Sequence, residues 1–291
     1  MGTHGNREDK GGFNLIAVNG QTVHSETFPN GETRIDGAAI TSSLFTEKMN
    51  AIDFKYQTDA DLLRLMFVRR YIADHKVHLR IWYMPYSRQD RKQYLSTVFT
   101  LRYICDFIND LHFDAVTVVE PHSDVTCALL NNCLSIYPTV ELMNEVRAKI
   151  GFDAERDYLF YPDAGAQKRY GYVFGLRSLV AIKQRNFQTG QITSLDVVGD
   201  KLVDHPKILI VDDLCSYGGT FLLSAERLTE LGAGDIYLFV THCERSVYDG
   251  KMIYSPLIKG LFTTDSILEK PLGHAIPVNE KIHVFDLKEV F

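Results

Sequence analysis

The chain has 291 residues, which is enough for two domains of ordinary size with their own apolar cores. Its 45% hydrophobic and 23% charged residues are typical of a globular protein, and the formal net charge of −6 argues against a general nucleic-acid binder. No apolar run approaches the ~20 residues that cross a bilayer, so we expect no membrane segment.

The cysteines and the N-terminal residues indicate a cytoplasmic protein. Five cysteines are scattered along the chain without CxxC spacing, which favours reduced thiols. Residues 1–12 are polar and glycine-rich, without the apolar centre of a signal peptide, and we expect them to form a flexible arm.

In the first half of the chain, apolar runs alternate with helical patterns. Residues 13–18, 78–84 and 115–119 have the character of strands. Thr58 is placed to cap a helix, and apolar residues recur at helical spacing between 98 and 111. Alternating strands and helices predict a mainly parallel sheet flanked by helices.

Three polar segments of this half are candidate ligand-binding loops. Residues 29–31 force a turn that holds Phe28 and Glu32 on either side, either to contact a base or as ordinary hairpin residues. Residues 86–91 follow a strand and carry two arginines, which match phosphate oxygens but also suit a solvated charged loop. His122 follows the next strand and can bind a metal or serve the fold.

The second half repeats the alternation, and we place the domain boundary after Lys149. Predicted strands cover residues 158–160, 179–182, 208–211, 236–240, 257–262 and 282–285, the last two at or near a sheet edge. Asp163 follows the first of these strands. Lys183 and Arg185 follow the second, at the root of a polar segment, 186–191, that is expected to be mobile. This pair can close over a charged transition state or be solvated.

Residues 207–221 combine a buried strand, two adjacent carboxylates and a small-residue turn that opens a helix. Asp212 and Asp213 fall at the carboxyl end of the strand, where open α/β sheets bind ligands. The helix opened by residues 218–220 has free N–H groups that favour phosphate. The carboxylates suit sugar hydroxyls or a metal ion, although a plain strand end and helix cap also explain these residues.

Taken in this order, the loops resemble those of the ribose-phosphate diphosphokinases, also called phosphoribosyl pyrophosphate synthetases. The resemblance spans roughly residues 13–285. It implies two α/β domains of the type I phosphoribosyltransferase fold, with residues 13–149 on the ATP side and residues 150–291 carrying the catalytic and ribose-phosphate loops. It also implies a homo-oligomer, either a dimer or a hexamer built from dimers.

The resemblance implies Mg²⁺-dependent transfer of the β,γ-diphosphate of ATP to the anomeric hydroxyl of a 5-phosphorylated ribose, with release of AMP. The implied ATP-binding residues are Phe28, Asn30, Glu32, Arg88, Gln89, Asp90 and Arg91. The implied acceptor-binding residues are Asp163, Asp212, Asp213, Ser216, Tyr217, Gly218, Gly219 and Thr220. His122 and Asp163 are the implied metal ligands, and Lys183 and Arg185 the implied catalytic residues.

The acceptor loop departs from the family pattern. Ser216 and Tyr217 stand where the family usually has Asp-Thr, so a larger group beyond the 5-phosphate can be accommodated or stacked on Tyr217. Two acceptors therefore stay open: ribose 5-phosphate, and ADP-ribose, which some phage-encoded relatives diphosphorylate while rebuilding NAD. A phage-encoded protein would act in the host cytoplasm. Residues 54–57 also fail to match the family's allosteric loop.

Two other hypotheses belong to different functional classes. A phosphoribosyltransferase would share the loop around Asp212 but would not need the segments 28–32 and 88–91. A catalytically silent regulatory paralogue would not need Lys183 and Arg185 with a metal site. The presence of all these residues favours the diphosphokinase.

Overall fold

The computed structural model describes residues 15–92, 94–185, 192–268 and 280–289. The predicted arm, 1–12, and the segment 186–191 lie outside the described residues. The chain divides into two compact units, Met1–Ile136 and Tyr137–Phe291, and each unit is described by itself. In the described part of the chain, no helix has the length and apolar character needed to span a membrane.

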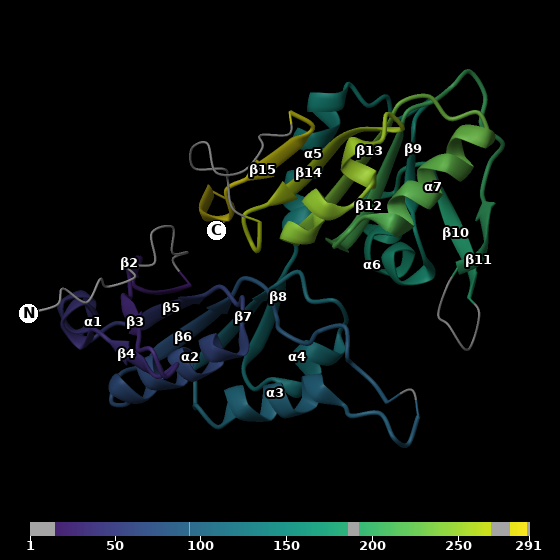
Figure 1. Ribbon diagram of the computed structural model, residues 1–291. Coiled ribbons are helices and arrows are strands. Elements are labelled where there is room, and N and C mark those ends of the chain that lie inside the picture. The colour runs from purple at the N-terminus through teal and green to yellow at the C-terminus, as the bar shows by residue number, and fades with distance from the viewer. Residues whose placement is uncertain (1–14, 93, 186–191, 269–279, 290–291) are drawn as a thin grey trace, which may run out of the picture. The chain divides into compact units, whose positions relative to one another are not determined.

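The first unit contains a six-stranded sheet in the order β2-β1-β5-β6-β7-β8 (Figure 1). The strands of this sheet are β1 (Ile16–Val18), β2 (Gln21–Thr22), β5 (Asn50–Phe54), β6 (Val77–Ile81), β7 (Ala115–Val119) and β8 (Cys133–Ile136). β3 (Ser25–Thr27) and β4 (Thr33–Ile35) form a separate antiparallel hairpin. The helices are α1 (Gly37–Ser43), α2 (Asp59–Tyr71), α3 (Thr100–Asn109) and α4 (Val125–Leu129). β5 to β8 are parallel, so their carboxyl ends share one edge.

The sequence pattern explains why these elements form. β5 and β6 alternate buried and partly exposed residues, which puts Ile52 and Leu79 in a core with Leu65 of α2 and Cys105 of α3. α2 begins where predicted, since the Asp61 carboxylate accepts the Thr58 N–H at 2.7 Å and caps the helix.

The second unit contains a seven-stranded sheet in the order β11-β10-β9-β12-β13-β14-β15, parallel except for β11. The strands are β9 (Tyr158–Tyr161), β10 (Ser178–Arg185), β11 (Ile192–Val198), β12 (Ile208–Cys215), β13 (Ile236–Cys243), β14 (Ile258–Thr264) and β15 (Ile282–Phe285). The helices are α5 (Pro138–Ile150), α6 (Ala164–Phe174) and α7 (Gly219–Glu230), with short 3-10 helices η1 (Arg245–Asp249), η2 (Met252–Tyr254) and η3 (Leu287–Glu289).

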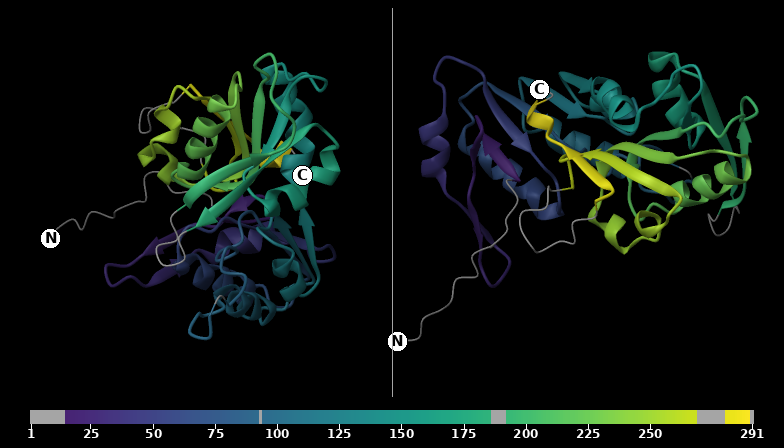
Figure 2. Two further views of the ribbon diagram at one scale, coloured as in Figure 1. Left: turned by 90° about the vertical axis from the view of Figure 1, so that its right-hand side faces the viewer. Right: turned by 90° about the horizontal axis from the view of Figure 1, so that it is seen from above.

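Helices cover both faces of the second sheet (Figure 2). Ile208 and Ile210 of β12 face the core that contains α7, whereas Leu209 and Val211 face the core that contains α5 and α6. A strand buried on both faces reads as an unbroken apolar run, which is the pattern on which β12 was predicted.

Several predicted strand ends and the predicted boundary differ from the structure, and two of those strand ends bear on the site. β12 continues to Cys215, because β13 pairs with it as far as Cys243. Asp212 and Asp213 are therefore strand residues rather than loop residues. β10 continues to Arg185 because it pairs with β11. The units divide after Ile136 rather than after Lys149, because α5 packs in the core of the second unit.

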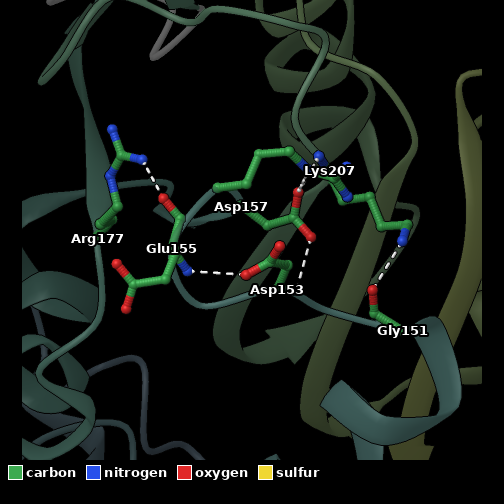
Figure 3. A network of polar contacts seen from close by, with 7 residues as sticks. Gly151, Asp153, Glu155, Asp157, Arg177 and Lys207 are labelled. Atoms are coloured by element: carbon green, nitrogen blue, oxygen red, sulfur yellow. Dashed lines mark hydrogen bonds and ion pairs between the residues drawn. The ribbon is translucent and has the colours of Figure 1, made fainter.

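A buried aspartate organises the end of the second sheet that is opposite Asp212 (Figure 3). Asp157 accepts the N–H groups of Asp153 at 2.8 Å and Lys207 at 2.9 Å. Burial would raise the pKa of Asp157, but these bonds and the one from Arg156 hold it below its ordinary value. The Lys207 side chain in turn donates to the Gly151 carbonyl at 2.7 Å, so the turn after α5 is tied to the start of β12.

The expectation of reduced thiols agrees with the structure, in which all five cysteines are free. Cys127 and Cys133 are neighbours, with their Sγ atoms 2.9 Å apart. The hydrogen bond from Cys133 lowers the pKa of the Cys127 thiol to about 7.

Candidate functional site

The loop after β6 carries the predicted ATP-phosphate residues. Asp90 is buried, and Arg91 binds it in a bidentate pair with N–O distances of 2.7 and 2.9 Å. Gln89 donates its N–H to the Tyr86 carbonyl at 2.9 Å, which closes a turn around the exposed Arg88. The Asp90–Arg91 pair thus shapes the loop, while Arg88 is left on the surface.

This loop meets the one that follows the neighbouring strand, β7. The Arg91 hydrogen bonds lower the pKa of Asp90, with further contributions from a Ser123 hydrogen bond and from the charge of His122. Because β6 and β7 are parallel neighbours, their loops leave the same edge of the sheet. The structure therefore brings Asp90 and Arg91 together with His122.

The predicted base-contacting turn is a tight hairpin between β3 and β4. The Phe28 N–H donates to the Glu32 carbonyl at 2.8 Å, and the Asn30 side chain accepts the Glu32 N–H at 3.1 Å. Phe28 remains 45% exposed, which leaves its ring available to a ligand. Arg64 of α2 bonds Thr27 at 3.3 Å, so the hairpin is anchored on that helix.

In the second unit, three carboxylates gather at the carboxyl ends of β9 and β12. Asp163 caps α6 by accepting the Ala166 N–H at 3.0 Å. Burial raises the pKa of Asp212 well above its ordinary value, and the charges of Asp213 and Asp163 raise it further. Asp213 is buried with its carboxylate 3.2 Å from Arg169 of α6. The ion pair with Arg169 stabilises the charge of Asp213, whereas the surroundings of Asp212 disfavour its charged form.

Arg169 was not predicted from the sequence. It lies within α6, and nothing in the local pattern shows that it pairs with a carboxylate on another strand. The one sequence feature that points to Arg169 is its position about one and a half helical turns after the acidic N-cap Asp163. Many surface helices have an arginine at such a position, so this feature does not distinguish Arg169.

The predicted phosphate loop leads directly into α7. Gly218 has a φ of 78° and is the N-cap of the helix, and a Cβ there would lie 2.7 Å from the Met252 Cβ. Glycine is therefore needed both for the backbone conformation and for the close approach to η2. The first N–H groups of α7, from Gly219 and Thr220, stand at the helix start where anions bind.

The two residues that depart from the family pattern differ in their surroundings. Ser216 Oγ lies 3.0 Å from Ser246 Oγ, and Ser246 donates to the Glu244 carboxylate at 3.0 Å. Tyr217 is 60% exposed. A Cβ at Gly250 would come within 2.0 Å of the Tyr217 carbonyl oxygen, so the loop backbone fits closely against η1. Ser216 thus serves the fold of the loop, while the Tyr217 side chain is available.

The remaining predicted residues are the catalytic pair and the two metal ligands. Lys183 and Arg185 lie in β10, where they pair with Leu195 and Ile192 of β11, and their side chains are outside the described part of the structure. His122 belongs to the first unit and Asp163 to the second. Among the described residues, no group of three or more His, Cys, Asp or Glu side chains is arranged to hold a metal ion.

Comparison with known proteins finds relatives along almost the whole chain. A ribose-phosphate pyrophosphokinase from Sulfurisphaera tokodaii is 26% identical over 280 residues, which cover 93% of this chain and 93% of that protein. The chain is a homologue of the ribose-phosphate pyrophosphokinases. A second such enzyme, from Bradyrhizobium diazoefficiens, is 27% identical over 236 residues, or 80% of this chain and 71% of its own length. No protein-family model matches the chain.

The relatives confirm the resemblance predicted from the loops, and with it an enzyme of the diphosphokinase type. The crystal structure of phosphoribosylpyrophosphate synthetase from Mycobacterium smegmatis matches with a TM-score of 0.69 and 17% identity, covering 93% of this chain and 87% of that one. This likeness concerns the fold, and it confirms the predicted α/β class of mainly parallel sheets flanked by helices.

Proposed function

We propose that the protein transfers the β,γ-diphosphate of ATP to the anomeric hydroxyl of a 5-phosphorylated ribose and releases AMP. The observation that carries the proposal is the pairing of Asp212 and Asp213 with the glycine-led start of α7 in a homologue of the ribose-phosphate pyrophosphokinases. Carboxyl groups suit ribose hydroxyls, and the helix start suits the 5-phosphate.

The carboxyl pair is well matched to a diol. Asp213, paired with Arg169, can accept a hydrogen bond, whereas the raised pKa of Asp212 favours a neutral form that can also donate one. Two neighbouring ribose hydroxyls can each donate to one partner and accept from another. The Gly219 and Thr220 N–H groups would bind the 5-phosphate.

On the donor side, Phe28 would stack on adenine and Glu32 would accept from its amino group. Arg88 would bind the ATP phosphates, with Gln89, Asp90 and Arg91 shaping the loop. The anomeric oxygen attacks the β-phosphorus, the bond from that phosphorus to the oxygen of the α-phosphate breaks, and AMP leaves with that oxygen. The hydroxyl proton passes to solvent. Such in-line transfer depends on positioning and charge neutralisation more than on a covalent nucleophile.

Magnesium is part of the proposal, with His122 and Asp163 as its ligands. Carboxylate oxygen is the donor that Mg²⁺ prefers. Burial and then the charges of Asp213 and Asp163 raise the pKa of Asp212, and a cation relieves the repulsion between these carboxylates. When bound, the ion would neutralise phosphate charge. Dialysis against a chelator is expected to abolish turnover, and added Mg²⁺ to restore it.

Lys183 and Arg185 would stabilise the charge that develops on the transferring group. Lys183→Ala and Arg185→Ala are each expected to lower kcat by about 10²–10³-fold, since removing one such contact commonly costs that much. AMP release from ATP is the measurement. Lys201→Ala changes an exposed lysine beyond β11 and serves as the control. Near-normal turnover in both active-site variants would remove them from the catalytic assignment.

The acceptor is proposed to be ribose 5-phosphate or ADP-ribose. The names of the relatives favour ribose 5-phosphate, whereas the exposed Tyr217 favours an acceptor with a group beyond the phosphate. Each acceptor is incubated separately with ATP and Mg²⁺, and AMP is measured. Release with ribose 5-phosphate alone would eliminate ADP-ribose. Release with neither would revive the regulatory paralogue.

A homo-oligomer in the cytoplasm, a dimer or a hexamer built from dimers, completes the proposal. Light scattering of the purified chain gives the assembly directly, and a monomer at micromolar concentration would contradict this part.

A further inference from the structure

Two tyrosine hydroxyls converge on one carboxylate oxygen next to the 86–91 loop. The hydroxyls of Tyr56 and Tyr86 lie 2.7 and 2.6 Å from Asp59 Oδ1. Tyr56 follows β5, Tyr86 follows the adjacent parallel strand β6, and Asp59 is the first residue of α2. The two rings also touch, with centroids 6.4 Å apart. We call these three residues the tyrosine clamp.

The backbone of Tyr86 needs such support. Its φ of 60° is in the left-handed region, which is rare and strained for a bulky residue. Conformations of this kind persist only where the surroundings impose them. The Tyr86 carbonyl accepts the Gln89 N–H, so the turn that presents Arg88 starts at this strained residue.

Asp59 is well placed to supply that support at neutral pH. The hydrogen bonds from Tyr86 and Tyr56 lower the pKa of Asp59. Its position in the first turn of α2 also favours the charged form. Hydrogen bonds to an ionised acceptor are about twice as strong as neutral ones, so the clamp holds Tyr86 more firmly than a neutral partner would.

We propose that Asp59 is a positioning residue, which fixes Tyr86 and thereby the 86–91 loop in the conformation that receives the ATP phosphates. Asp59 acts through Tyr86 and touches no substrate. The inference rests on the proposed function, because it assigns the loop to ATP.

The test compares kinetics and binding in Asp59→Asn and Tyr86→Phe. Each variant is expected to raise KM for ATP about tenfold and to weaken calorimetric binding of a non-hydrolysable ATP analogue equally, with kcat and KM for the acceptor unchanged. Asp59→Asn also removes a negative charge near a polyphosphate, which would by itself tighten binding. The same loss in Tyr86→Phe, which keeps the carboxylate, therefore points to the clamp.

Two further variants test whether the effect belongs to the hydrogen bond between Tyr86 and Asp59. Tyr56→Phe leaves the Tyr86 bond in place and is expected to change KM for ATP less than Tyr86→Phe does. Tyr71→Phe is the matched control, because it removes a tyrosine hydroxyl at the other end of α2, 3.0 Å from Thr41 Oγ1. It is expected to leave KM for ATP unchanged.

The outcomes separate this proposal from the one on which it rests. If Asp59→Asn and Tyr86→Phe bind the analogue as the unmodified protein does while Arg88→Ala does not, the clamp is overturned and the proposed function stands. If the unmodified protein itself binds no analogue, both are overturned. Circular dichroism confirms folding, and Tyr86→Phe decides alone if Asp59→Asn fails to fold.

Discussion

At the scale of single residues, the carboxyl group of Asp212 is held in a place that disfavours its charge. Burial and the neighbouring carboxylates raise its pKa in the folded state. As pH rises above ~4, the unfolded chain ionises this group before the folded chain does, so folding loses stability until the folded pKa is passed. Asp212→Asn removes that loss. We expect Tm at pH 8 to rise by about 2–4 °C, the shift that ~1 kcal/mol produces for a protein of this size.

The gain in Tm from Asp212→Asn is expected to depend on pH. The difference in Tm between Asp212→Asn and the unmodified protein is expected to vanish below pH ~3, where the group is protonated in both the folded and the unfolded state. Glu226→Gln changes an exposed carboxylate of α7 and is expected to leave Tm unchanged at every pH. A lower Tm for Asp212→Asn at pH 8 would contradict the idea that this site trades stability for binding.

Local patterns identified some site residues and missed others. Asp212 and Gly218 were predictable, because a strand followed by acids and a glycine-led helix is written in consecutive residues. Arg169 and Asp59 were not, because each acts on a partner from a different element. A hydrogen bond between distant residues has no signature in the spacing of either one.

At the scale of elements, the turn between α5 and β9 depends on the charge of Asp157. Its two carboxylate oxygens accept the N–H groups of Asp153 and Lys207, so an amide in its place would direct a donor at a donor. We expect Asp157→Asn to lower the free energy of unfolding at pH 7 by about 1.5–3 kcal/mol, the range for hydrogen bonds to a charged group. Chemical denaturation measures the change.

The difference in free energy of unfolding between Asp157→Asn and the unmodified protein is expected to depend on pH. The pKa of Asp157 is lowered by folding, so its contribution is complete above ~4 and is lost as pH falls through the lower folded pKa. The two proteins should therefore converge in acid. Glu155→Gln is the matched control, since Glu155 joins the same network through its backbone and its side chain is exposed (Figure 3). An equal loss in the free energy of unfolding of Glu155→Gln would contradict the assignment of this stability to the Asp157 carboxylate.

Element positions followed from the sequence more closely than element ends. Residues 115–119 and 282–285 were predicted as strands with the bounds observed. β12 and β10 run further than predicted, since pairing with β13 and β11 extends strands through Asp212 and Lys183, where a single-strand pattern stops at the first polar residue. Strand length is decided by the neighbour, which the local sequence does not show.

At the scale of the whole molecule, both units place their polar loops at one edge of a sheet of parallel strands. Within each unit, loops that are far apart in the sequence therefore lie at the same edge. The boundary after Ile136 follows from α5, whose apolar face belongs to the second core. A helix pattern shows that a helix exists but not which neighbour it covers.

The boundary can be tested by comparing two fragments of the second unit. A fragment of residues 137–291 retains α5, which buries Leu142, Met143, Val146 and Ile150 in the core that contains β9 and β12. A fragment of residues 150–291 lacks three of these side chains, Leu142, Met143 and Val146, which removes about 4.5–9 kcal/mol of burial energy, comparable to the whole stability of a typical domain. We therefore expect residues 137–291 to unfold cooperatively and residues 150–291 to show no cooperative transition in urea. Equal stability of the two fragments would return the boundary to Lys149, with α5 acting only as a linker.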